Sequence, residues 1–278
     1  MKNNYYWGRP GGDYDTLLRS LSLTSVNSGK TSSIPLAEFW HPNRNKELRE
    51  QLLKTINIAP DTYDDSNKIF EYATQAYKDG VEGPAIQYSG PSMTDLMIIG
   101  EKMRITIEAK YTEYSKDSHP YTPSIGEWIE GHPTNQNRLA ILNCWRRYIG
   151  LDKYPDLVTA KNQDKDFPYQ FLHRTASACF NPNDEERRIL LYQLFWDSTT
   201  KEKLGEFEKN LKNWAYLLKL KEHKLDFYIA EIEIDEDENN SPAIKLTKTS
   251  KPFLDMIDNK QYSFKSIVCK DGYSLKSI

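Results

Sequence analysis

The segment from Thr94 to Tyr114, TDLMIIGEKMRITIEAKYTEY, limits the possible folds of this chain more than any other segment. Two apolar runs rich in β-branched residues flank Gly100 and Glu101, a pattern typical of two strands joined by a tight turn. A third β-rich run precedes them and ends at another glycine. Together they predict a three-strand meander formed by AIQYSG at 85–90, TDLMIIG at 94–100 and MRITIEAKYTE at 103–113.

Helical patterns precede and follow this meander. Residues 36–57 and 66–78 carry apolar side chains at helical spacing, and Ser66 suits the N-cap of the second helix. Later in the chain the pattern predicts helices at 135–150, 167–180 and 199–220 and strands at 187–197 and 225–234. This order predicts an α/β fold with a mixed central β-sheet flanked by helices.

Composition divides the chain into three regions. Residues 1–35 are rich in Gly, Ser, Thr and Asn, and we expect them to form an N-terminal arm or loops. Residues 36–235 hold the alternating helices and strands, and we expect them to form the main domain. The acidic run DEDENNSP at 235–242 leads into residues 236–278, which we expect to form a β-rich C-terminal extension packed on the same domain.

Charge and hydropathy restrict the partners. No apolar run approaches the roughly 18 residues that a membrane span needs, and the start, MKNNYYWGRPGG, lacks the apolar core of a signal peptide. We therefore expect a cytoplasmic protein with no membrane partner. The formal charge of −3 lacks the basic excess of an indiscriminate nucleic-acid binder. A polyanionic partner would need basic residues gathered on one face.

The second strand of the meander carries the main candidate site. Side chains alternate along a strand, so Glu108 and Lys110 project from the same face, about 7 Å apart at their Cα atoms. Pairing across the turn is expected to bring Asp95, at the start of the preceding strand, near Lys110. The sequence therefore predicts two carboxylates and one ammonium group at a strand end.

This set of groups suits phosphodiester hydrolysis. Mg²⁺ binds oxygen ligands, typically one or two carboxylates completed by water and substrate phosphate. A nearby lysine can position or deprotonate the attacking water, and its pKa would fall if it were desolvated beside the metal. The alternative is an ordinary surface ion pair, worth under about 1 kcal/mol. Of the three acid-x-Lys triplets, at Glu108–Lys110, Glu222–Lys224 and Asp258–Lys260, only the first follows an apolar strand.

The segment TDLMIIG…ITIEAKYTE resembles the core motif of the PD-(D/E)XK restriction-endonuclease-like nuclease superfamily, with Thr94 where the pattern has proline. It is also similar to a group of uncharacterised bacterial restriction-like nucleases, through KYTE and a later PYQFLHR. The resemblance implies a restriction-endonuclease-like core at 36–235. It further implies catalysis by Asp95, Glu108 and Lys110, with Mg²⁺, or Mn²⁺ as a substitute, held by Asp95 and Glu108.

In that superfamily a helix before the meander often supplies a further metal-binding acid. Glu71 and Glu38 are the candidates here, and Glu71 is preferred because it is closer in sequence. Gln170 and Arg174 lie four residues apart on one helical face and could approach the site from the following helix.

Two functions from different classes follow. The first is a Mg²⁺-dependent endodeoxyribonuclease of restriction type or of anti-phage defence, with DNA as its substrate. It could act as a homodimer or larger homo-oligomer, or with a protein partner of a defence system. The second is a catalytically inactive nuclease-fold module for nucleic-acid binding or assembly.

Overall fold

The computed structural model describes residues 5–7, 31–77, 90–114, 123–131, 136–151, 167–180, 186–218, 224–236 and 262–273. These residues form one seven-stranded sheet in the order β1-β2-β3-β4-β5-β6-β7. The strands are β1 (Tyr5–Trp7), β2 (Asn67–Thr74), β3 (Ser92–Ile99), β4 (Met103–Lys110), β5 (Arg187–Trp196), β6 (Leu225–Glu236) and β7 (Tyr262–Asp271). The helices are α3 (Ser33–Phe39), α4 (Lys46–Thr55), α5 (Pro60–Asp64), α6 (Ile125–Glu130), α7 (Gln136–Ile149), α8 (Tyr169–Cys179) and α9 (Lys201–Leu217).

The sheet mixes both strand directions. β2, β3 and β4 pair antiparallel, β4, β5 and β6 pair parallel, and β7 returns antiparallel to β6. Parallel neighbours need a crossover connection, and α8 lies in the connection from β4 to β5, as α9 lies in the connection from β5 to β6. The predicted α/β fold with a mixed sheet flanked by helices is confirmed.

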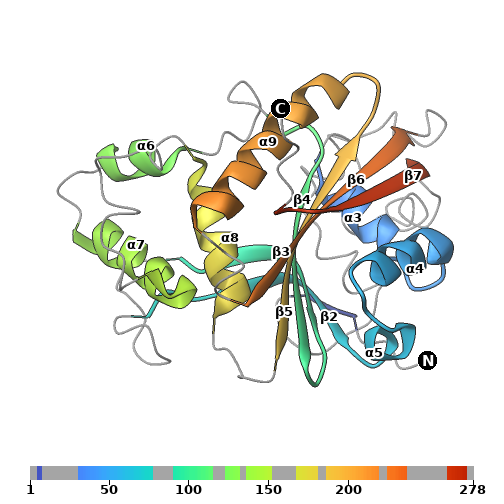
Figure 1. The fold of residues 1–278 in the computed structure, drawn as a ribbon, viewed down its shortest axis with the longest axis horizontal. Helices are drawn as coiled ribbons and strands as arrows, with labels where there is room; N and C mark the ends of the chain where they lie inside the picture. The colour runs from blue at the N-terminus through green and yellow to red at the C-terminus, as the bar shows by residue number, and fades with distance from the viewer. Residues whose placement is uncertain are drawn as a thin grey trace, which may run out of the picture.

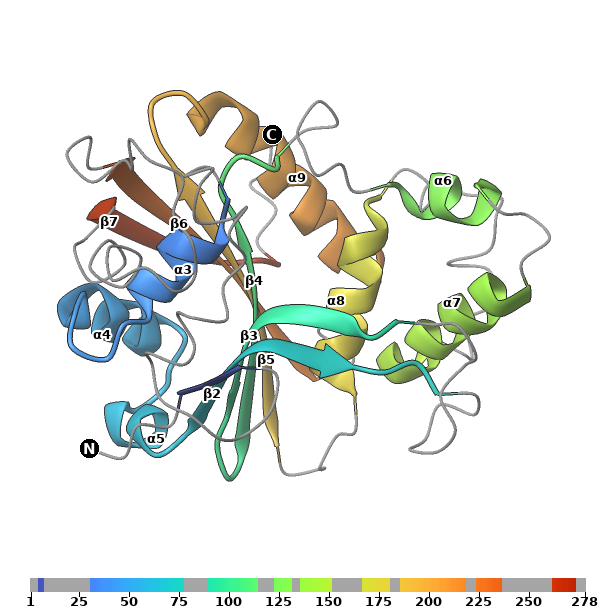
Figure 2. The same cartoon turned by 180° about the vertical axis from the view of Figure 1, so that it is seen from behind.

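Helices cover both faces of the sheet (Figure 1, Figure 2). α3, α4 and α5 lie on one side, α8 and α9 lie on the other, and α6 and α7 extend beyond α8. The central strand β5 contributes to both cores because its side chains alternate. Ile189 and Leu191 join the core beneath α3 and α4, whereas Leu190 and Tyr192 join the core beneath α8 and α9.

The helix predicted at 66–78 is wrong, because this segment contains strand β2. β2 buries Lys68, Ile69 and Phe70 in succession, so it lacks the alternation by which a strand is recognised. The backbone at Glu71 then adopts φ 49° and interrupts the regular pairing. The apolar residues of this irregular strand therefore recur at helical spacing in the sequence.

Other elements of the structure differ in detail from the prediction. The helical pattern at 36–57 is divided between α3 and α4, since Asn45 takes a left-handed conformation just before α4 begins. The first strand of the meander is β2, and the predicted strand at 85–89 lies outside the described residues. Within the predicted N-terminal arm, Tyr5–Trp7 form β1 and pair with β2.

None of the helices in the described ranges has the length and apolar character needed to cross a membrane.

Candidate active site

Three acidic residues occupy one row across neighbouring strands β2, β3 and β4. The residues on either side of Glu71 pair with those on either side of Asp95, so the two acids occupy opposite positions. Leu96 pairs with Ile107, and the next position in the same register places Asp95 opposite Glu108. The sheet thus aligns three carboxyl groups that are widely separated in the sequence.

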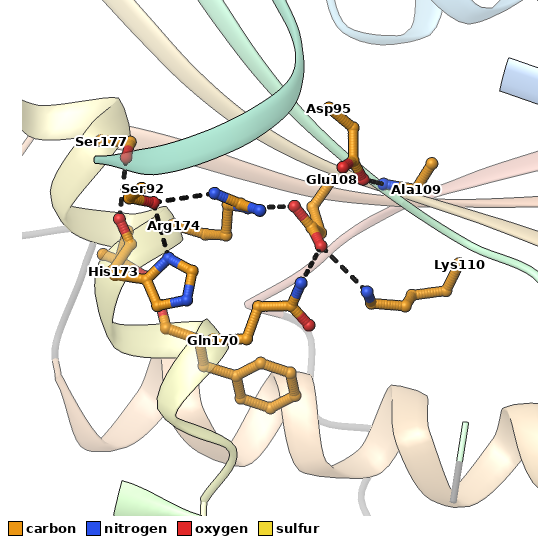
Figure 3. Close-up of polar contacts among 11 residues, drawn as sticks. Ser92, Asp95, Glu108, Ala109, Lys110, Gln170, His173, Arg174 and Ser177 are labelled. Atoms are coloured by element: carbon orange, nitrogen blue, oxygen red, sulfur yellow. Dashed lines mark hydrogen bonds and ion pairs between the residues drawn. The ribbon is translucent and has the colours of Figure 1, made fainter. Parts of the chain in front are cut away.

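Glu108 is the centre of the site and is fully buried. Its Oε1 accepts a hydrogen bond from Gln170 Nε2 and lies 3.0 Å from Lys110 Nζ, while its Oε2 accepts a hydrogen bond from Arg174 Nε (Figure 3). Burial alone would raise the pKa of Glu108, but the charges of Arg174 and Lys110 outweigh it and lower the pKa. Glu108 is therefore ionised at neutral pH.

Lys110 projects from the same face of β4 as Glu108, as predicted from strand alternation. Desolvation lowers the pKa of a buried lysine, yet the charges of Glu108, Glu113 and Asp95 outweigh this effect and raise the pKa of Lys110. The predicted lowering applies to a lysine beside a bound metal, and for that case it stays a prediction. Lys110 is a cation in this arrangement.

Asp95 lies beside Glu108 and not, as expected, beside Lys110. The turn consists of Glu101 and Lys102, so Ile99 pairs with Arg104 and Asp95 falls opposite Glu108. Asp95 Oδ2 accepts a hydrogen bond of 2.8 Å from the backbone N–H of Ala109. Burial raises the pKa of Asp95 well above its usual value, and the negative charge of Glu108 raises it further. The two carboxyl groups therefore repel each other when both are ionised.

Glu71 lies on strand β2, not on the helix from which it was expected to act. Burial raises its pKa, Arg174 lowers it and Glu108 raises it, so Glu71 shares the electrostatic environment of the site. Its φ of 49° is uncommon for a residue other than glycine, and such strain is found preferentially at functional sites. Glu38, the other candidate acid, accepts a hydrogen bond from the backbone N–H of Tyr262 in the opposite core and does not join the row.

Helix α8 supplies the second half of the site. Gln170 and Arg174, one turn apart, both contact Glu108, and Arg174 Nη1 also donates to Ser92 Oγ at 2.8 Å. Ser92 Oγ lies 2.7 Å from His173 Nδ1. Burial and the nearby Arg174 charge lower the pKa of His173 well below its usual value, so this ring is neutral. The sequence indicated Gln170 and Arg174, but it gave no signal for the Ser92–His173 pair.

The donor set fits a hard divalent cation. In the described part of the chain, no three His, Cys, Asp or Glu side chains form a metal-binding group by themselves. Mg²⁺ needs fewer protein ligands, typically one or two carboxylates. A carboxylate offers about four lone-pair positions, and donors from the described residues use three on Glu108 and one on Asp95. Asp95 and Glu108 thus retain capacity for a cation, which would also relieve their mutual repulsion.

Comparison with known proteins gives a family and no function. No curated protein and no solved structure matches this chain. Residues 22–236 match the family described as Domain of unknown function (DUF6946). The match includes the acidic row and α8, and it ends at the last residue of β6. The chain therefore belongs to the DUF6946 family.

Proposed function

We propose that this protein is a Mg²⁺-dependent endodeoxyribonuclease that hydrolyses phosphodiester bonds of DNA. The observation that carries the proposal is the alignment of Asp95 with Glu108, with the Lys110 ammonium 3.0 Å from Glu108. Strand alternation and hairpin pairing bring these groups together, and the resemblance of the same segment to the PD-(D/E)XK nucleases gives them roles.

Asp95 and Glu108 would hold the Mg²⁺ ion, for which Mn²⁺ could substitute. A bound ion of this kind polarises the phosphate and lowers the pKa of a coordinated water. Glu71 occupies the next position in the row and would contribute negative charge or a water-mediated contact.

The chain's own cations act on the charge that develops at the phosphate. Without a bound ion, Glu108, Glu113 and Asp95 keep Lys110 protonated, and its role would be to orient the attacking water and to stabilise the negative charge of the transition state. Arg174 and Gln170 fix the Glu108 carboxylate in one orientation. Such buried donors, held in place before the reaction, favour the transition state without further reorganisation.

A role in restriction or anti-phage defence follows from the resemblance to bacterial restriction-like nucleases. In that setting two copies of the chain, each with one site, would cut the two strands of a duplex. A protein partner of the defence system would regulate cleavage.

A second candidate is a catalytically inactive nuclease-fold module that binds nucleic acid or assembles with other proteins. The observation that favours it is that both oxygens of Glu108 already have partners, namely Lys110, Gln170 and Arg174. If these contacts persist in the presence of Mg²⁺, the carboxylate is a structural anchor and no cation binds.

One assay separates the two candidates. The purified protein is incubated with supercoiled plasmid, single-stranded DNA and RNA, each with and without Mg²⁺. The nuclease proposal expects Mg²⁺-dependent cutting of DNA by the wild type, none by Asp95→Asn, and unchanged cutting by the matched control Asp226→Asn, whose carboxylate forms an ion pair with Arg187 on the sheet. Binding of DNA without cutting would favour the inactive module.

A further inference from the structure

A pocket adjoins the acidic row on the side of α8. Its volume is about 470 Å³, within the range of small-molecule sites. It lies between Gly90–Met93, which lead into and begin β3, and the helices α6, α7 and α8. Helices α6, α7 and α8 lie on the same side of the sheet in Figure 2.

Aromatic side chains form much of the wall. Trp128 stacks on Tyr169 with ring centroids 4.1 Å apart and an angle of 6° between the planes. Trp145 Nε1 donates to the Tyr169 hydroxyl at 2.8 Å, which fixes the orientation of both rings. The Arg138 guanidinium lies 5.0 Å from the centre of the Trp128 ring. The wall is therefore a rigid set of flat surfaces.

The charge of the lining is positive. Arg138 and Arg174 both line the pocket, and none of the described lining residues is acidic. Asn137 adds an amide that can donate and accept hydrogen bonds. Flat aromatic walls combined with arginines favour a planar aromatic ring that carries an adjacent phosphate. This is the chemistry of a nucleotide.

The pocket is continuous with the candidate active site. Arg174 lines the pocket and contacts Glu108, and Ser92 lines it three residues before Asp95 on β3. A phosphate held at Asp95 and Glu108 would therefore have its neighbouring nucleotide at the mouth of this pocket.

We propose that the pocket binds one nucleobase of the DNA strand, unstacked from its neighbours, next to the phosphate that is cut. This inference rests on the proposed nuclease function and adds a specificity site to it. The same chemistry could come from a free mononucleotide, so the experiment separates the two sources.

Fluorescence of 2-aminopurine reports unstacking directly. The base is placed at successive positions of a duplex, which is bound to the Lys110→Met variant in Ca²⁺ so that cleavage does not interfere. We expect a several-fold rise at a position next to the unstacked base, which loses a stacking neighbour, and loss of that rise in the double variant with Gly90→Phe. A 2-aminopurine inside the pocket would itself be quenched by the aromatic wall. A Cβ at Gly90 meets no atom within 4 Å, so the new ring can enter the pocket. The matched control is Gly205→Phe, at an exposed glycine of α9 that is equally open.

A second pocket variant, Ile141→Trp, fills the site from α7 if Gly90→Phe does not fold. No rise at any position, or a rise that survives both filling variants, overturns the proposal. Titration with each of the four deoxynucleoside monophosphates, followed by tryptophan fluorescence, provides the other arm. Quenching by a mononucleotide without any 2-aminopurine rise in DNA assigns the pocket to a free nucleotide and also overturns the proposal.

The two proposals fail in different ways. If the Gly90→Phe and Ile141→Trp variants cut plasmid as fast as the wild type, the base pocket is refuted and the nuclease proposal stands. A 2-aminopurine rise that depends on the pocket, in a protein that never cuts DNA, supports base binding and refutes the nuclease.

Discussion

Lys110 and Glu108 lie two residues apart on one face of β4, and Lys110 Nζ is 3.0 Å from Glu108 Oε1. Arg174 approaches the other oxygen of the same carboxylate from α8. The buried Glu108 carboxylate therefore fixes the positions of Lys110 and Arg174. Its charge also keeps Lys110 protonated, although burial opposes this. The arrangement places a fixed positive charge beside the proposed metal-binding acids.

Replacing Lys110 by methionine should reduce the rate of DNA cleavage by at least about a hundredfold, since it removes charge stabilisation of the transition state. Methionine keeps most of the apolar stem of lysine, so the circular dichroism spectrum should be unchanged. The matched control is Lys224→Met, an exposed lysine that closes another acid-x-Lys triplet of the sequence, Glu222–Lys224. Equal loss of activity in both variants, or none in Lys110→Met, would remove Lys110 from the mechanism.

Replacing Arg174 by methionine should lower the free energy of unfolding by about 3 kcal/mol, because it leaves part of a buried carboxylate charge uncompensated. The partner, Glu108, is fully buried. Arg187→Met removes an ion pair with Asp226 that is partly exposed, and should cost under about 1 kcal/mol. Urea denaturation of the two variants measures the difference. Similar losses would show that the Arg174–Glu108 contact is energetically ordinary.

Asp197 should make stability depend on pH in the acid range. Burial opposes ionisation, but hydrogen bonds from Tyr111 and Thr199 prevail and lower the pKa of Asp197 to about 2 from its ordinary 3.8. A lowered carboxyl pKa stabilises the fold above the unfolded-state pKa, and this contribution is lost as the pH falls through the folded-state pKa.

We therefore expect the wild type to exceed Asp197→Asn in unfolding free energy by about 1 kcal/mol at neutral pH, allowing for solvent screening. The gap should close between about pH 4 and pH 2. Urea unfolding at a series of pH values measures it. Thr199→Ala, which removes one donor to Asp197, should give a smaller effect of the same sign. A gap that stays constant down to pH 2 would contradict the assignment.

Two glycines should respond oppositely to alanine. A Cβ on Gly272 would lie 2.2 Å from Phe227 Cδ1 in the core, so Gly272→Ala should destabilise by about 1–3 kcal/mol. Gly205 lies within α9 in open space, so Gly205→Ala should stabilise by about 0.5–1 kcal/mol. Thermal unfolding of both variants tests the packing of α9 and of the end of β7. Shifts of the same sign would contradict that packing.

Local patterns were enough to predict strands β3 and β4, which carry Asp95, Glu108 and Lys110. The alternation in β4 correctly placed Glu108 and Lys110 on one face, because that strand is regular. β2 was mistaken for a helix because the backbone at Glu71 departs from strand geometry. No residue in this segment indicates a positive φ at that position. A turn at Gly100–Glu101 would have placed Asp95 opposite Thr106, and the observed turn at Glu101–Lys102 places it opposite Glu108, so the expected position near Lys110 came from a wrong register.

The contacts made across the fold were harder to predict. Ser92 and His173 are 81 residues apart in the sequence, and their hydrogen bond depends on how α8 packs on the sheet. The raised pKa of Lys110 likewise depends on the summed charges around it. A sequence pattern contains the separation of residues along one strand, but not the field created by several packed elements.

The most direct test of the central claim, that Asp95 and Glu108 hold a divalent cation beside Lys110, is calorimetric titration of the purified protein with Mn²⁺. We predict about one bound Mn²⁺ per chain for the wild type and for Asp226→Asn, and no binding to this site by Asp95→Asn. Equal binding by the wild type and Asp95→Asn, or no binding by the wild type, would contradict the account.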